Sequence, residues 1–166
     1  MGGRSPSRSR SSARASTPSR RAFSRTWWPP SACRSTPLVD FELPEEFWRG
    51  LEQFNSGQFY ACHDTLEALW MDALHPLRLF YQGILQLAVA YYHLGNRNWQ
   101  GCVILLSTGI ERLDYFAPEY LGVDVETLLE QSAACLEALQ TLGPERIAIF
   151  DTARIPKIAY VREIRS

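Results

Sequence analysis

The stretch that decides the fold is "PLRLFYQGILQLAVAYYHLG", residues 76–95. Its apolar side chains recur at helical spacing and form one wide stripe, made of Leu77, Phe80, Tyr81, Ile84, Leu85, Ala88, Tyr91 and Tyr92. Leu79 and Val89 fall on the opposite side, so the helix is apolar on nearly every face. Because such a helix must be covered all round, we expect it to lie at the centre of a helical domain.

Helical spacing continues on both sides of this stretch, and capping residues divide it into segments. Asn55 can cap the preceding helix, with Gln58 three residues later completing a capping box. Asp124 can cap the last helix, which should end at Gly143 and Pro144. The helices predicted besides 76–95 cover residues 44–54, 55–73, 98–116 and 124–142. The tail after them should pack as extended chain with one short helical turn.

The predicted fold is therefore all-α, a compact bundle of about five helices. A faint internal repeat at an offset of 40 residues aligns Phe59 with Trp99 and Cys62 with Cys102. Repeated helical hairpins of this kind are typical of tetratricopeptide proteins. Two imperfect copies are fewer than the three that such arrays need, so the bundle is only faintly tetratricopeptide-like.

Charge divides the chain into residues 1–39 and residues 40–166. The first segment contains eight arginines and no acidic residue, whereas the second contains nine basic and 18 acidic residues, a net charge of −9. The Arg/Ser/Pro-rich segment has almost nothing to bury, so we expect a disordered leader ahead of a single all-α domain. It resembles an organelle transit peptide, a basic nucleic-acid-binding arm, or sequence upstream of a mis-assigned start.

Composition also narrows the partners of the domain. Its net negative charge disfavours nucleic acid as a partner, and no apolar run reaches the ~18 residues that span a membrane. Four cysteines lie far apart without a Cys-x-x-Cys pair, which favours reduced thiols in an intracellular protein. We therefore expect a cytoplasmic protein, or a plastid protein if the leader is a genuine transit peptide.

Two titratable residues interrupt the apolar stripe of the helix before the central one. His63 shares an arc of about 60° with Phe59, Leu66 and Trp70, and Glu67 lies at the edge of that arc. We therefore expect His63 to point toward the core and to share a hydrogen bond with Glu67, one helical turn later. These two residues are the candidate catalytic pair.

A polar strip on the central helix is predicted to face this pair. Folding the two helices into a hairpin places Glu67 and His63 opposite one strip of the next helix, made of Arg78, Gln82, Gln86 and His93. A buried carboxylate needs such partners because it costs several kcal/mol without them. Together with Trp70, which would cover the cluster from solvent, these residues are the candidate ligand-binding set.

Four stretches of the sequence resemble a known family. The sequence is similar to the domain of unknown function 309 family over roughly residues 40–160. The stretches that carry the resemblance are the one quoted above, "FNSGQFYACHDTLEALW" at residues 54–70, "GCVILLSTGIERL" at 101–113 and "IPKI" at 155–158. The family's motif positions correspond to Phe54, Asn55, Gly57, Phe59, His63, Glu67, Trp70, Gln82 and His93. Asp64 stands where the family often has glutamate, and Cys62 stands where it often has alanine. The resemblance implies a small all-α fold and no particular activity.

Four functions remain open for the cluster. It can be a structural network, a ligand pocket lined by Trp70, Tyr81, Tyr91 or Tyr92, an acid–base site, or a metal site with His93 as a third donor. Of these four we do not favour the metal site, and we assign no metal ligands, because His93 should lie too far along its helix from His63. The sequence specifies no cofactor or oligomeric state.

We interpret the chain as a small-ligand or protein-interaction module. The alternative is a metal-assisted or acid–base enzyme of hydrolase or isomerase kind that uses His63 and Glu67.

Overall fold

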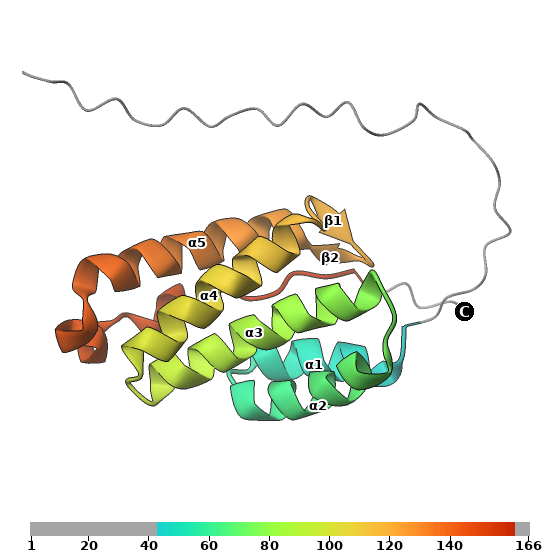
Figure 1. Ribbon diagram of the computed structural model, residues 1–166, viewed down its shortest axis with the longest axis horizontal. Coiled ribbons are helices and arrows are strands. Elements are labelled where there is room, and N and C mark those ends of the chain that lie inside the picture. Colours follow the sequence, from blue (N-terminus) through green and yellow to red (C-terminus); the bar gives the residue numbers. More distant parts are fainter. Residues whose placement is uncertain (1–42, 162–166) are drawn as a thin grey trace, which may run out of the picture. The chain divides into compact units, whose positions relative to one another are not determined.

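The computed structural model describes residues 43–161 (Figure 1). The chain divides into two units, residues 1–40 and residues 41–166, and the described residues all belong to the second. The predicted disorder of residues 1–39 falls outside them. Within residues 43–161 the regular elements are all helices apart from one two-stranded hairpin, so the all-α prediction is confirmed. No helix in this part of the chain is long and apolar enough to cross a membrane.

Five α-helices follow one another and each packs on the next. They are α1 (Glu45–Asn55), α2 (Phe59–Asp72), α3 (Leu77–Gly95), α4 (Trp99–Asp114) and α5 (Val125–Leu142). Strands β1 (Glu119–Tyr120) and β2 (Val123–Asp124) form an antiparallel hairpin between α4 and α5, which was not predicted. The 3₁₀ helices η1 (Pro144–Ile149) and η2 (Thr152–Arg154) follow α5.

Helix α3 is central, as its sequence predicts. Nine of its 19 residues are buried: Phe80, Tyr81, Gly83, Ile84, Leu87, Ala88, Ala90, Tyr91 and Leu94. Glycines let α4 approach it closely, because a Cβ on Gly109 would lie 2.9 Å from Leu87 Cδ2 and 3.2 Å from the carbonyl oxygen of Gly83. This close approach explains why a poor helix former is present at Gly109.

One predicted cap is confirmed and one is wrong. Asp124 caps α5, since its Oδ1 accepts a hydrogen bond of 3.0 Å from the backbone N–H of Thr127. Asn55 does not cap α2. It is the last residue of α1, and Gly57, at φ +75°, turns the chain before α2 begins. Gln58 occupies the N-cap position of α2 without any side-chain hydrogen bond.

The side chain of Asn55 instead anchors the C-terminal segment, residues 150–161, which we name the strap. Asn55 Nδ2 donates to the carbonyl oxygen of Ile158 at 2.9 Å, and its Oδ1 accepts from the Ile158 N–H at 2.7 Å. The thiol of Cys135 in α5 donates to the carbonyl oxygen of Arg154. The strap is extended apart from η2, ties α5 to α1 and then pairs with β2 through Tyr160. The tail after α5 contains two 3₁₀ helices, η1 and η2, where the sequence predicted one short helical turn.

Candidate functional site

The predicted catalytic pair does not form. Glu67 is exposed, and His63, with 28% of its side chain exposed, has its Nδ1 3.2 Å from Oδ1 of Asp64. The fully buried residues of α2 are Cys62 and Leu66, so the buried side is centred on one edge of the predicted arc, at Leu66, and His63 lies at the opposite edge. The prediction of a buried His63–Glu67 hydrogen bond is therefore wrong, because the covered face of α2 is turned from the predicted arc toward Cys62 and leaves Glu67 in solvent.

The other predicted site residues divide into separate contacts. The guanidinium of Arg78 lies 4.5 Å from the centroid of the Trp70 ring, a cation–π contact that joins α2 to α3. His93 Nδ1 lies 3.2 Å from Nδ2 of Asn98. Gln82 is half-buried, and Gln86 has a buried Oε1 that accepts no hydrogen bond within residues 43–161. Nor do any three His, Cys, Asp or Glu side chains in that range gather closely enough to hold a metal ion.

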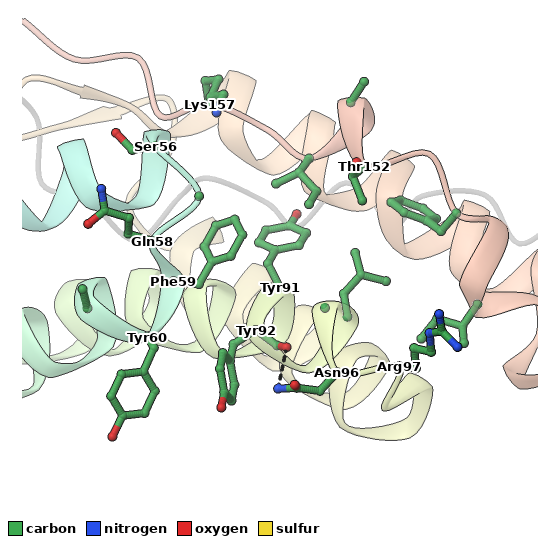
Figure 2. Close-up of a pocket in the computed structure, with 18 of the residues that line it drawn as sticks. Ser56, Gln58, Phe59, Tyr60, Tyr91, Tyr92, Asn96, Arg97, Thr152 and Lys157 are labelled. Atoms are coloured by element: carbon green, nitrogen blue, oxygen red, sulfur yellow. Dashed lines mark hydrogen bonds between the residues drawn. The ribbon is translucent and has the colours of Figure 1, made fainter.

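A pocket of about 990 Å³ opens elsewhere, where three segments meet (Figure 2). These segments are the α1–α2 loop with the start of α2 (residues 56–61), the end of α3 with its following turn (91–97), and residues 147–157. The apolar part of the lining consists mainly of Phe59, Tyr91, Ile147, Phe150 and Ile155. Tyr91 and Tyr92, two of the tyrosines proposed from the sequence, line it, whereas Trp70 and Tyr81 do not.

The lining of this pocket is positively charged. It includes Arg97 and Lys157 and no aspartate or glutamate, although residues 40–166 as a whole carry a net charge of −9. Lys157 lies at the α1–α2 end, where its ammonium donates to the carbonyl oxygen of Asn55. Arg97 lies at the α3–α4 end, and within the described residues its guanidinium forms no hydrogen bond or ion pair.

The start of α2 adds to this positive character. Its first internal hydrogen bond runs from the N–H of Cys62 to the carbonyl oxygen of Gln58. The preceding N–H groups, of Phe59, Tyr60 and Ala61, have no acceptor among residues 43–161, and all three residues line the pocket. Unpaired N–H groups at a helix N-terminus carry partial positive charge and favour a nearby anion.

Arg97 occupies an unusual backbone conformation. Its φ of +58° lies in the left-handed region, where a residue with a Cβ costs roughly 1–2 kcal/mol. The tight turn between α3 and α4 requires it, since the Arg97 N–H donates to Leu94 and the Asn98 N–H donates to His93. Glycine or asparagine would adopt this conformation at lower cost. The chain nevertheless has a long cation here, at the rim of the pocket.

Tyr91 lies on the floor of the pocket and is 1% exposed. Its ring packs edge-on against Phe54, with 5.9 Å between the ring centroids, and at a tilt against Phe59, with 5.5 Å between the centroids. Burial raises the pKa of its hydroxyl well above the ordinary value, so the group stays protonated and can donate a hydrogen bond. Figure 2 shows this hydroxyl directed toward the strap side of the pocket.

Comparison with known proteins supports the resemblance drawn from the sequence. Residues 47–105 match the family model of the domain of unknown function DUF309. The DUF309 match extends from α1 into α4 and so includes the start of α2 and the α3–α4 turn. A relative, "Uncharacterized protein YpuF" of Bacillus subtilis (strain 168), is 31% identical over 104 residues, which are 60% of this chain and 60% of that protein.

Sequence reasoning missed Arg97, Lys157 and the role of Asn55. The "IPKI" segment could have drawn attention to Lys157 and to Ile158, the residue that Asn55 holds, and it lies in the strap. Its partner could not be found from the sequence, because Asn55 lies 103 residues before Ile158.

Proposed function

We propose that this DUF309-related chain is a small-ligand-binding module, and that its pocket binds a molecule with an apolar body and an anionic group. The observation that carries the proposal is the lining, in which two cations and no carboxylate surround aromatic and aliphatic side chains in an otherwise acidic domain. Concave, largely apolar pockets with a few polar groups are the usual sites for small molecules. An intracellular location belongs to the proposal and is supported by the free thiols of Cys62, Cys102 and Cys135.

The apolar and charged groups divide the recognition between them. Phe59, Tyr91 and Phe150 offer ring surfaces on which an apolar body can pack. Arg97, Lys157 and the first turn of α2 provide the positive potential that favours an anion over a neutral molecule. A ligand of about 12 non-hydrogen atoms at ~0.3–0.5 kcal/mol per atom binds with a Kd of roughly 0.04–2 mM, which sets the concentrations for a test.

The test uses the full chain and the probe 4-phenylbutanoate, which displaces the fluorescent reporter 1-anilinonaphthalene-8-sulfonate. The uncharged amide of the same acid is the matched probe, and we expect it to bind at least several-fold more weakly. Arg97→Gln should weaken binding of the carboxylate, whereas Arg49→Gln, on the exposed side of α1 and outside the lining, should not. Equal binding of acid and amide, or equal effects of the two substitutions, would refute an anion-binding pocket.

Acid–base chemistry at His63 remains the second candidate function. The observation in its favour is that Asp64 Oδ1 lies 3.2 Å from Nδ1 of the imidazole, so a carboxylate can orient the ring while the ring stays partly accessible. In this version Asp64 takes the role that the sequence suggested for Glu67. Hydrolysis of p-nitrophenyl butyrate that is lost in His63→Gln and kept in Glu67→Gln would support it, and absence of any hydrolysis would count against this esterase form of the hypothesis.

A further inference from the structure

Four aromatic rings follow one another across the outer side of α2 and α3, and we name them the aromatic patch: His63, Tyr60, Tyr92 and His93. The Tyr60 ring stacks on the His63 ring, with 6.4 Å between the centroids, and its centroid lies 5.6 Å from that of the Tyr92 ring on the neighbouring helix. Tyr60 is 61% exposed and Tyr92 is 42% exposed. Neighbouring apolar rings left open to solvent are typical of a surface that binds another molecule, and tyrosine is enriched at such interfaces.

The exposed tyrosine rings point away from the inside of the pocket. Figure 2 shows the rings of Phe59 and Tyr91 directed toward the strap, whereas the rings of Tyr60 and Tyr92 extend from the opposite side of α2 and α3. Since consecutive residues of a helix point about 100° apart, each of these pairs presents one ring to the pocket and one to the outside. A ligand in the pocket therefore leaves the outer faces of Tyr60 and Tyr92 open to a second partner.

The face of α2 that carries the patch is acidic. Residues three or four positions apart form one side of the helix, and all of them are exposed: Tyr60, Asp64, Glu67 and Met71. Helix α2 contains three acidic residues and no lysine or arginine. Within residues 43–161, Glu67 forms no ion pair and Asp64 forms one only with the imidazole of His63. A partner that complements this face therefore brings positive charge to the two carboxylates.

The same charge disfavours the other partners that bind exposed tyrosines. Nucleic-acid bases stack on such rings, but their phosphates would then lie close to Asp64 and Glu67. A second copy of the domain would bring its own acidic surface, since residues 40–166 carry a net charge of −9. Charge complementarity therefore favours a cationic partner over both.

Arginine is the side chain that fits the rings and the carboxylates together. Its planar guanidinium stacks on aromatic faces and donates paired hydrogen bonds to a carboxylate, whereas a lysine ammonium acts as a point charge. The other end of α2 shows this kind of contact, because the guanidinium of Arg78 lies 4.5 Å from the centroid of the Trp70 ring. One arginine of the chain is thus already stacked on an aromatic side chain of the same helix.

We propose that the aromatic patch, with the carboxylates of Asp64 and Glu67, is a docking surface for an arginine-rich segment of a partner protein. One guanidinium of the segment stacks on the rings of Tyr60 and Tyr92, and a guanidinium beside it pairs with the carboxylate of Glu67. The surface lies outside the pocket, so the inference does not rest on the small-ligand function.

The test measures the binding of two fluorescein-labelled peptides, octa-arginine and octa-lysine, to the full chain by fluorescence anisotropy at near-physiological salt. The peptides carry the same charge, so their general attraction to an acidic domain is the same and the ratio of their dissociation constants reports the guanidinium groups. Wild type should prefer octa-arginine by about 2- to 5-fold, the effect of one exposed cation–π contact.

Matched variants locate the preference. Substituting both rings, Tyr60→Leu with Tyr92→Leu, should abolish it, whereas Tyr115→Leu, which changes a 77% exposed tyrosine at the end of α4, should keep it. Glu67→Gln should weaken binding of both peptides more than Glu130→Gln, which removes one exposed carboxylate from α5. Since all these side chains are at least partly exposed to solvent, the variants should fold, and their melting temperatures check this.

Several results would overturn the inference. They are the absence of binding by either peptide, equal affinity of wild type for the two, and a preference that persists when both tyrosines are replaced. Self-association of wild type in sedimentation velocity that the double substitution abolishes would assign the patch to a second copy instead. Binding of oligouridylate that the same substitution abolishes would assign it to nucleic acid.

Discussion

The contact between Asn55 and the strap predicts a large loss of stability from one polar substitution. Asn55→Ala removes two hydrogen bonds to the backbone of Ile158, of 2.9 and 2.7 Å. Ile158 is 2% exposed, so its N–H and carbonyl groups would lose their partners with little access to water. Each lost bond costs about 0.5–1.5 kcal/mol, and a buried group left unpaired costs about 1–3 kcal/mol.

We therefore expect Asn55→Ala to lower the free energy of unfolding by about 2–4 kcal/mol. For a domain of this size, each kcal/mol corresponds to roughly 3–5 °C in melting temperature, so the decrease should be on the order of 10 °C. The assay is thermal and urea denaturation followed by circular dichroism at 222 nm. Because the strap forms one wall of the pocket, binding of 4-phenylbutanoate should weaken in parallel.

Asn96→Ala is the matched control. Asn96 also lies at the C-terminal end of a helix, but it is exposed and its Nδ2 donates to the nearby carbonyl oxygen of Tyr92 at 3.1 Å. Removing this local bond should cost less than about 1 kcal/mol. If Asn55→Ala loses no more stability than Asn96→Ala, the strap is not held by Asn55 and the reasoning is wrong.

Three further predictions rest on the structure and one on the sequence. Gly83→Ala should cost about 1–3 kcal/mol in urea denaturation, because its Cβ would lie 2.6 Å from Cγ of buried Leu113, whereas Gly95→Ala, with open space around it, should cost nothing. Hydrogen bonds from Thr127 lower the pKa of Asp124. The charge of Asp124 therefore stabilises the fold fully above pH ~4, and this stabilisation is lost as the pH falls through the lowered pKa. The difference in melting temperature between wild type and Asp124→Asn should accordingly shrink in acid. Burial raises the pKa of Cys62 and Cys102 to about 12, so in a Cys33→Ser variant at pH 8 a disulfide reagent should react with the thiols only after urea unfolds the protein. The leader hypothesis predicts that deleting residues 1–39 leaves the melting temperature unchanged, and a clear decrease would contradict it.

Local rules in the sequence determined the helices. The all-round apolar pattern of residues 77–95 placed α3 at the centre, and the Asp124 cap marked the start of α5, because both depend on residues a few positions apart. The same rules gave the wrong role for Asn55. They predicted that it caps α2, whereas it ends α1, and the two cases differ only in where the chain turns. Gly57 and the distant strap decided that turn.

The candidate site depended on tertiary structure. Periodicity placed His63 near the buried arc of α2, but the neighbouring helices cover Cys62 and Leu66, so Glu67 remains in solvent. The pocket brings together three segments separated by up to about 100 residues, and the strap that completes it has no periodicity to mark its partner. The sequence by itself therefore determined which segments are helical. Only the packing of those helices and of the strap decided which polar groups meet, because that depends on the rotation of each helix and on contacts that span almost the whole domain.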